Sequence, residues 1–598
     1  MKRILLSTAL SVALMSGITG CGDDNQKKQT IVKKQEPTRT LAERKKAFEA
    51  NLKALNTYGL DANLTTNDDK EAHYLLHVSD PKKAMISLME IANQHPASLD
   101  RSEQEAFMEV LKTQTFGLDV NWEKYQTNAA DSVTVYYISK DAKPPLKKLI
   151  DEKKLAAYLS FDNQDALKKI RFNNLDERLS ENNETVAIKL QDTHIDFSVP
   201  PSTKNNKSAY TLTSKAFNVD FIDNEFNTTT SVGYNDITCK IDKENAYLGK
   251  ESCVIPTITI TSDVGFTGKL TISDTHYDID NTLHDKKIKS DVKLSIDTIS
   301  GTIANQSNTN DTLKMKDLKI DVVTDNIDAQ TMKTFYDVLH DNTKDANATI
   351  REMMHTLGEI YSNGTTIDYT ISLASTKADT EEVGFLLTNY TGKGNGRFDD
   401  NISYHDMSTV KSIEIQDKET NATTFAMHHM QFGYAIKDLY NILPAFFDFS
   451  GKLTAAQKEG NALPDEKQLA PLKKSAEKIV HQGFGFDLDP IGFDDMKFDI
   501  RGKEAEFGKL SIALHTLLKR NDIPLDINNP MTGMMLIPFL QADGKIVIRK
   551  KDLELLAKQF PPAMVGMAMM MGKPEGENLV YDLKFENGHL LVNGQPMM

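Results

Sequence analysis

The middle of the chain alternates apolar and polar residues from about residue 184 to 325, with Asn, Asp and Gly where the alternation breaks. Side chains two residues apart lie on one face of a β-strand, so this pattern predicts strands with one apolar and one hydrated face. Such strands are typical of antiparallel sheets, because the strands of a doubly wound parallel sheet are apolar throughout. Examples are Ile258 and Ile260; Val292, Leu294 and Ile296; and Leu318, Ile320 and Val322.

Helical periodicity precedes and follows this region. Apolar residues recur at three- and four-residue spacing over residues 41–58, 101–115 and 145–156, and a short strand is predicted over 132–138. Later, the order strand, helix, helix, strand occurs over 318–373 and again over 430–488, and a partial third copy begins at Ile546. The chain ends with a hairpin, whose Asn587-Gly588 pair predicts a type I′ turn.

These patterns together predict an α+β fold. We expect an elongated, curved antiparallel β-sheet structure with amphipathic helices packed on one face and weak internal duplication. The predicted regions are a lipoprotein signal peptide (1–20), a lipidated Cys with a flexible tether (21–40), an N-terminal α/β region (41–180), an antiparallel β region (181–330), a strand–helix–helix repeat region (331–480) and a C-terminal β/α region ending in the hairpin (481–598).

A long sheet with one apolar face must bury that face against something. If the helix pairs cover only part of a curved sheet, an apolar concavity remains that accepts an acyl chain or a hydrophobic polypeptide segment. Methionines crowd the last part of the chain, and their flexible, polarisable side chains suit such a surface; ordinary core packing is the alternative. The candidate groove residues are Met564, Met567, Met570, Phe484 and Phe486.

Composition and charge exclude several classes of protein. Of 598 residues, 39% are hydrophobic, which is too few for a polytopic membrane protein and enough for sizeable cores in a folded chain. The formal net charge of −15 argues against nucleic acid as a partner, because phosphate backbones bind basic surfaces.

The N-terminus predicts the compartment. Lys2 and Arg3 precede an apolar run over residues 4–18 that is too short to span a membrane and is typical of a signal peptide. It ends in Ile-Thr-Gly-Cys, which resembles the bacterial lipobox; an ordinary signal with a chance Cys is the alternative. The resemblance implies cleavage before Cys21 and acyl chains, including palmitate, on this residue, hence a stable membrane anchor. The residue after the lipidated Cys is Gly22 and not the Asp that retains enteric lipoproteins in the inner membrane, so the resemblance favours the outer membrane. Whether the protein faces the periplasm or the cell surface is left open.

Two further cysteines, Cys239 and Cys253, lie in β-type sequence 14 positions apart. An exported protein folds in an oxidising compartment, so we predict a disulfide between them; two free buried thiols are the alternative. No His or further Cys stands at metal-ligand spacing, and we expect no metal site there.

The stricter acceptor pattern Asp/Glu-x-Asn-x-Ser/Thr occurs more often than the composition explains. This pattern resembles the acceptor of campylobacter-type N-glycosylation and predicts exposed, hydrated turns. The alternative is that Asp, Asn and Thr cluster in turns for structural reasons. The six candidate residues are Asn63, Asn183, Asn227, Asn347, Asn401 and Asn421.

Motifs that carry catalysis are missing from the sequence. It has no G-x-S-x-G elbow, no P-loop and no H-E-x-x-H. The glycine-rich run Gly392–Arg397 lacks the strand-to-helix context of a phosphate loop and predicts a mobile turn, while adjacent His428 and His429 would point to opposite faces of a strand. The acidic residues over 487–495 lack EF-hand spacing. We therefore expect no enzyme activity, no catalytic residue, no cofactor and no metal.

Two family resemblances add to this. The segments IVHQGFGFDLDPIGFDDMKFDI and LVYDLKFENGHLLVNGQPMM resemble the YdgA-like family of bacterial envelope proteins. The lipobox, the two-cysteine segment and the strand-rich middle also resemble JlpA-type surface lipoproteins of campylobacters. This second resemblance implies an unclosed, curved β fold with an apolar basin and a role in host-cell adhesion. Neither family supplies catalytic residues.

The sequence thus predicts a lipid-anchored binding protein of the cell envelope that holds a lipid or a hydrophobic polypeptide segment in an apolar β concavity. The alternatives are a surface-exposed adhesin lipoprotein and an unrecognised envelope hydrolase. The expected partners are the membrane, through the lipid anchor, and a lipid or envelope protein.

Overall fold

The computed structural model describes residues 39–85, 101–139, 144–181, 183–200, 207–245, 247–263, 267–304, 310–340, 346–458, 466–500, 503–524, 530–556 and 562–597. Most of them are in strands, and the strand pairs are antiparallel, as the alternation predicts. The predicted signal peptide and Cys21 lie outside the described residues. Among those described, no helix is long and apolar enough to cross a membrane.

The chain forms two compact units. Unit 1 contains Met1–Asn281 and Leu339–Ala346, and unit 2 contains Thr282–Val338 and Asn347–Met598. Each unit is described by itself below.

Unit 1 begins with short helices packed on short strands. The predicted helices and the strand over 132–138 are present, with ends within a few residues of those expected. The elements are α2 (Leu41–Ala54), η1 (Leu55–Tyr58), β1 (Leu60–Asn67), β2 (Glu71–Val78), α4 (Arg101–Lys112), β3 (Thr115–Asn121), α5 (Trp122–Gln126), β4 (Val133–Ile138), α6 (Pro144–Asp151), β5 (Ala156–Phe161) and β6 (Leu167–Phe172).

The hydrophobic core of unit 1 lies among these elements, in buried side chains between residues 48 and 170. Phe48 of α2 is fully buried and meets the rings of Trp122 and Tyr125 edge-on, with centroids 5.8 Å and 5.5 Å away. Phe161 completes the aromatic cluster, 5.2 Å from Tyr125. Such packing is that of an ordinary protein interior.

The strands of unit 1 lengthen after this core. Strand β10 pairs along one edge with both β9 and β8, end to end, and along the other edge with β11, which pairs with β12. The elements are β7 (Leu175–Glu181), β8 (Glu184–Gln191), β9 (His194–Val199), β10 (Ser208–Asp223), β11 (Thr228–Lys243), β12 (Gly249–Ser262) and β13 (Thr267–His284).

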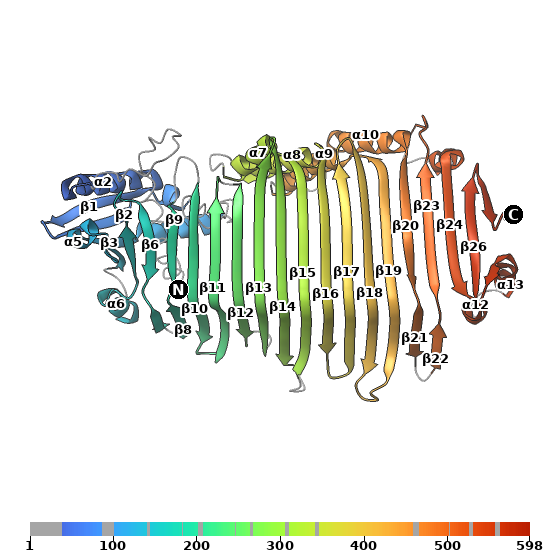
Figure 1. The fold of residues 1–598 in the computed structure, drawn as a ribbon, viewed down its shortest axis with the longest axis horizontal. Coiled ribbons are helices and arrows are strands. Elements are labelled where there is room, and N and C mark those ends of the chain that lie inside the picture. Colours follow the sequence, from blue (N-terminus) through green and yellow to red (C-terminus); the bar gives the residue numbers. More distant parts are fainter. Residues whose placement is uncertain are drawn as a thin grey trace, which may run out of the picture. The chain divides into compact units, whose positions relative to one another are not determined.

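Unit 2 is built from longer strands that pair in chain order from β14 to β19 (Figure 1). Strands β20 and β21 then share the next edge of β19. The elements of this part are β14 (Lys287–Ala304), β15 (Asn310–Asp328), α7 (Ala329–His340), α8 (Ala346–Ile360), β16 (Thr365–Asp379), β17 (Val383–Phe398), β18 (Asn401–Asp417), β19 (Thr423–Tyr440), α9 (Leu443–Lys458), α10 (Glu466–Gln482), β20 (Phe484–Phe493) and β21 (Asp495–Ile500).

The rest of unit 2 continues the sheet through β23, β24 and β26, with short helices between. Asn587 and Gly588 both have positive φ between β26 and β27, as the predicted type I′ hairpin requires. The elements are β22 (Lys503–Phe507), β23 (Leu510–Leu518), α11 (Pro530–Leu536), η3 (Ile537–Phe539), β24 (Leu540–Arg549), α12 (Lys550–Leu556), α13 (Pro562–Met571), β25 (Lys573–Glu575), β26 (Asn578–Glu586), β27 (His589–Val592) and β28 (Gln595–Pro596).

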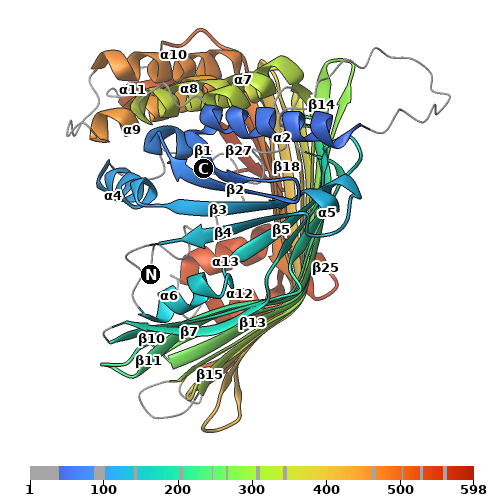
Figure 2. The same cartoon turned by 90° about the vertical axis from the view of Figure 1, so that its left-hand side faces the viewer.

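The strand–helix–helix–strand order is present at both predicted places. Helices α7 and α8 connect β15 to β16, and α9 and α10 connect β19 to β20, although each strand pair is antiparallel and adjacent. The helices lie together beyond one end of the long strands (Figure 2). Helix α8 packs closely on α9, because a Cβ on Gly358 would lie 2.9 Å from Pro444 Cα and one on Gly451 would lie 3.0 Å from Met354 Cβ.

Alternate strands of unit 2 carry non-glycine residues with positive φ near mid-strand, which are Asp317 on β15, Asn389 on β17 and His429 on β19. Asn326 and Asp438 also have positive φ, near the ends of β15 and β19. At Asp317, the apolar side chains change from odd-numbered positions (Leu313 and Met315) to even-numbered positions from Leu318 onward. The pairing register with β14 is the same on both sides of this residue. A left-handed residue of this kind re-aims the following side chains, as in a β-bulge, so the apolar side chains stay on one face.

Candidate functional site

One face of the sheet in unit 2 carries rows of apolar side chains that pair across strands. Leu294 lies opposite Ile320, which lies opposite Ile371, and the next row joins Val292, Val322 and Tyr369. We call the following set the apolar face: Val292, Leu294, Ile296, Leu318, Ile320, Val322, Ile367, Tyr369, Ile371, Leu373, Val410, Met430, Tyr434, Ile436, Phe486 and Leu488.

Every residue of the apolar face is only half-buried. This differs from the core of unit 1, where Phe48, Leu76 and Phe116 have no exposed surface. Contiguous, partly exposed apolar rows of this kind are uncommon on monomeric soluble proteins.

Among the described residues, contacts between helices and this side of the sheet occur near its margins. At the end beyond which α8 and α9 lie, Tyr361 packs its ring on Phe398 of β17 and stacks on Phe447 of α9. At the C-terminal edge, Tyr581 of β26 donates a hydrogen bond of 2.9 Å from its hydroxyl to the carbonyl of Ala568 in α13.

The glycine-rich run belongs to this face, and the prediction of a mobile turn there is wrong. Gly392, Gly394 and Gly396 occupy alternate positions of β17 and are paired on both sides. A Cβ on Gly394 would lie 2.5 Å from Cε1 of Tyr369, and one on Gly396 would lie 2.9 Å from Cδ2 of Tyr404. Tyrosine rings from the neighbouring strands therefore occupy the space that side chains of β17 would fill, which compensates for glycine in a strand.

An acidic side chain lies among these rings. Asp406 of β18 is 9% exposed and is opposite Gly394 on one side and Tyr434 on the other. The hydroxyl of Tyr369 donates a hydrogen bond to its carboxylate, and the hydroxyl of Tyr404 lies 3.4 Å from the same oxygen. We call Tyr369, Tyr404, Asp406 and Tyr434 the Tyr–Asp cluster.

Burial governs the electrostatics of this cluster. It raises the pKa of Asp406 above its ordinary value, because the charged form loses hydration, while a hydrogen bond with Ser408 acts in the opposite direction. It also raises the pKa of Tyr404 to about 12, with a further contribution from the hydrogen bond to Tyr434. The hydroxyl of Tyr404 is therefore protonated at physiological pH and can donate a hydrogen bond.

The predicted groove residues do not form one site. Met567 and Met570 are 48% and 83% exposed, so these two are not core residues. They lie on α13 after β24, whereas the exposed Met531, Met534 and Met535 lie on α11 before it. The side chain of Met564 is outside the described residues. Phe484 and Phe486 are half-buried on β20, and Phe486 is opposite Ile436 in the apolar face.

The opposite face of unit 2 is charged. Asp487 is buried and accepts hydrogen bonds across the strands from Lys437, whose Nζ is 2.6 Å away, and it lies 3.3 Å from Nδ1 of His515. The hydrogen bond that Lys437 donates to Asp487 raises the pKa of Lys437. These groups and Phe484 line a hollow of about 600 Å³.

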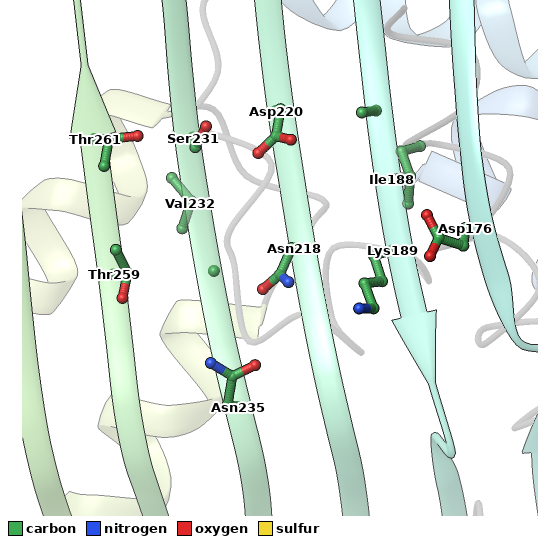
Figure 3. A pocket seen from close by; sticks show the side chains of 12 residues that line it. Asp176, Ile188, Lys189, Asn218, Asp220, Ser231, Val232, Asn235, Thr259 and Thr261 are labelled. Atoms are coloured by element: carbon green, nitrogen blue, oxygen red, sulfur yellow. The ribbon is translucent and has the colours of Figure 1, made fainter.

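Unit 1 has a smaller polar hollow of about 330 Å³ over β8, β10, β11 and β12 (Figure 3). Asn218, Asp220 and Ser231 point into it, with Lys189 at one side. Gly233 forms part of its floor, since a Cβ there would lie 2.5 Å from Oδ1 of Asn218. Sequence reasoning missed this hollow, because its residues resemble the hydrated face of any strand.

The predicted disulfide is confirmed. Cys239 of β11 lies directly opposite Cys253 of β12, and their sulfur atoms are bonded. The bond ties two neighbouring strands of unit 1 near the end of the β11–β12 hairpin.

The six acceptor-like asparagines differ in their surroundings. Asn183, Asn227 and Asn421 are exposed in turns between strands, and Asn63 is exposed within β1. Asn347 near the start of α8 and Asn401 at the start of β18 are half-buried. Glycosylation stays a prediction, for which the three turn residues are the most accessible.

The described residues contain no group of three or more His, Cys, Asp or Glu side chains placed to hold a metal ion. His428 and His429 contact different carboxylates, with Nδ1 of His428 2.6 Å from Asp495 and Nδ1 of His429 3.2 Å from Asp494.

No protein-family model matches the chain, and no curated protein or solved structure matches it significantly. The function must therefore be argued from the geometry of the chain itself.

Proposed function

We propose that the protein is a lipid-anchored binding protein of the cell envelope and that unit 2 holds the acyl chain of a lipid on its apolar face. The observation that carries this proposal is the set of paired, half-buried apolar rows from β14 to β20. The proposal includes curvature of the sheet, which would turn this face into a concavity, and internal duplication as the origin of the repeated helix pairs.

The free energy gained by burying an acyl chain on this face is sufficient for binding. Each methylene removed from water contributes about 0.8 kcal/mol. Adjacent strands are about 4.8 Å apart, so a row across β14 to β20 extends over roughly 30 Å and is long enough for an extended acyl chain. Burial of about ten methylenes along one row would contribute about 8 kcal/mol, which exceeds the lower estimate of the association cost, about 4 kcal/mol.

An acyl chain fits this face better than a polypeptide segment does. The backbone groups of β15 to β18 are paired on both sides within the sheet, so a peptide lying on the face finds no backbone partners. Its own N–H and C=O groups would lose water without replacement, which costs several kcal/mol. A hydrocarbon chain has no such groups.

Co-purified lipid provides the test. We expect native mass spectrometry of the full chain to show bound lipid, and Ile371→Glu to abolish it, since Ile371 lies in the middle of the apolar face. Its neighbour Thr370 lies on the opposite face, so Thr370→Glu is the matched control and should retain lipid. Circular dichroism should show both variants folded. Equal lipid content in both variants would contradict the proposal.

A surface-exposed adhesin is the second candidate. It is favoured by the polar hollow of unit 1, where amide, hydroxyl and carboxylate groups suit a carbohydrate ligand. Protease treatment of intact cells separates the two functions, because an adhesin must be cleaved from outside.

A further inference from the structure

The position of Asp406 is unusual for a carboxylate. It lies within a face made of aliphatic and aromatic side chains, and it is 9% exposed. Its hydrogen-bond partners are the hydroxyls of Tyr369, Tyr404 and Ser408. No Lys, Arg or His of the described residues forms a salt bridge with it, and its opposite neighbour on β17 is Gly394. A buried carboxylate without a cation is costly, and proteins keep such groups mainly at functional sites.

The aromatic surroundings favour a positive charge. The rings of Tyr404 and Tyr434 have centroids 5.7 Å apart, and Phe432 lies 5.9 Å from Tyr434. The tyrosines are half-buried and Phe432 is 45% exposed, so the rings remain accessible from the apolar face. Ring faces attract ammonium groups, most strongly where water is excluded, and an adjacent carboxylate adds to this attraction.

We propose that the Tyr–Asp cluster binds the cationic ammonium head group of the lipid whose acyl chain lies on the apolar face. The inference rests on the proposed function and adds the chemical class of its ligand: an amphiphile with a primary or quaternary amine. An anionic head group does not fit, because Asp406 repels it and the cluster holds no cationic donor.

Isothermal titration of the full chain tests the inference with three probes below their micelle concentrations. Dodecyltrimethylammonium carries the chain and the charge, dodecanoate carries the same length of chain with the opposite charge, and tetramethylammonium carries the charge alone. We expect Asp406→Asn to weaken dodecyltrimethylammonium binding about tenfold, as loss of a partly desolvated cation contact implies, and to leave dodecanoate binding unchanged or stronger.

Two variants serve as controls. Asp368→Asn removes the same charge from the exposed, opposite face of β16, two strands away from Asp406, and should change none of the affinities. Tyr434→Leu keeps the surface apolar but removes a ring, and should reduce the preference for the cationic probe without reducing dodecanoate binding.

The outcomes separate the two proposals. Equal binding of the cationic probe by the wild type, Asp406→Asn and Tyr434→Leu overturns the head-group inference and leaves acyl-chain binding intact. Failure of the wild type to bind either amphiphile overturns both. Tetramethylammonium binding as tight as that of dodecyltrimethylammonium overturns the assignment to a lipid and points to a free amine.

Discussion

At the scale of single residues, the centre of the apolar face depends on a glycine strand lined by tyrosines. Glycine elsewhere in a strand weakens it, but in β17 the rings of Tyr369 and Tyr404 take the missing positions. The same arrangement brings tyrosine hydroxyls to Asp406, so the glycines are needed for the cluster as well as for the packing.

Gly394→Ala should therefore be destabilising. The new Cβ would overlap the ring of Tyr369, and forcing a group into a packed region costs roughly 1–3 kcal/mol. Gly566→Ala in α13 is the matched control, because no atom lies within 4 Å of its added Cβ and Ala favours a helix. Chemical denaturation measures both; equal stability of Gly394→Ala and the wild type would show that the ring moves aside freely.

The stability contribution of Asp406 should depend on pH. Because burial raises its pKa, folding opposes ionisation, and this cost appears as pH rises above the ordinary Asp value of about 3.9. We expect Asp406→Asn to have a higher melting temperature than the wild type at neutral pH. This difference should disappear in acid, where Asp406 is protonated in both the folded and the unfolded state. A lower melting temperature of the variant at neutral pH would mean that the tyrosine hydrogen bonds outweigh burial.

At the scale of elements, the Cys239–Cys253 disulfide joins β11 to β12 in unit 1. It closes a loop with a sequence separation of 14, and a bond of that span contributes about 3 kcal/mol in the chain-entropy description. We expect Cys239→Ser/Cys253→Ser to lower the free energy of unfolding of unit 1 by about this amount. Hydrogen exchange should show that the double variant loses amide protection in β10 to β12. An equal loss of protection in both units would be inconsistent with this local role.

Elements with a strong period could be predicted from the sequence, and those that depend on neighbouring strands could not. The alternation at Val292 to Ile296 predicts β14, and the spacing after Ala346 predicts α8. Gly392–Arg397 has no periodic side chains of its own, because tyrosines from β16 and β18 supply its contacts. For β15, the sequence does contain a signal of irregularity. The apolar positions shift by one residue around Asp317, which indicates an irregular residue within a strand rather than a turn.

At the scale of the whole molecule, the predicted anchor would link the apolar face to a membrane. Fatty-acid labelling of cells with an alkyne analogue should mark the wild type and not Cys21→Ser, because the acyl chains are expected on that residue. Cys21→Ser should also leave the membrane fraction, since two or more acyl chains are needed for stable anchoring. Ser7→Ala is a control within the signal peptide and should be labelled as the wild type is; labelling of Cys21→Ser would refute the lipobox assignment.

The chain order of the strands in unit 2 has a consequence for how the sheet assembles. From β16 to β19 each strand pairs with the one made just before it, so each new pairing closes only a short loop. Such a sheet can grow strand by strand as the polypeptide arrives, with local contacts and little delay. The steps β15 to β16, β19 to β20 and β24 to β26 must wait, because in each of them a helix pair has to form before the next strand returns to its neighbour.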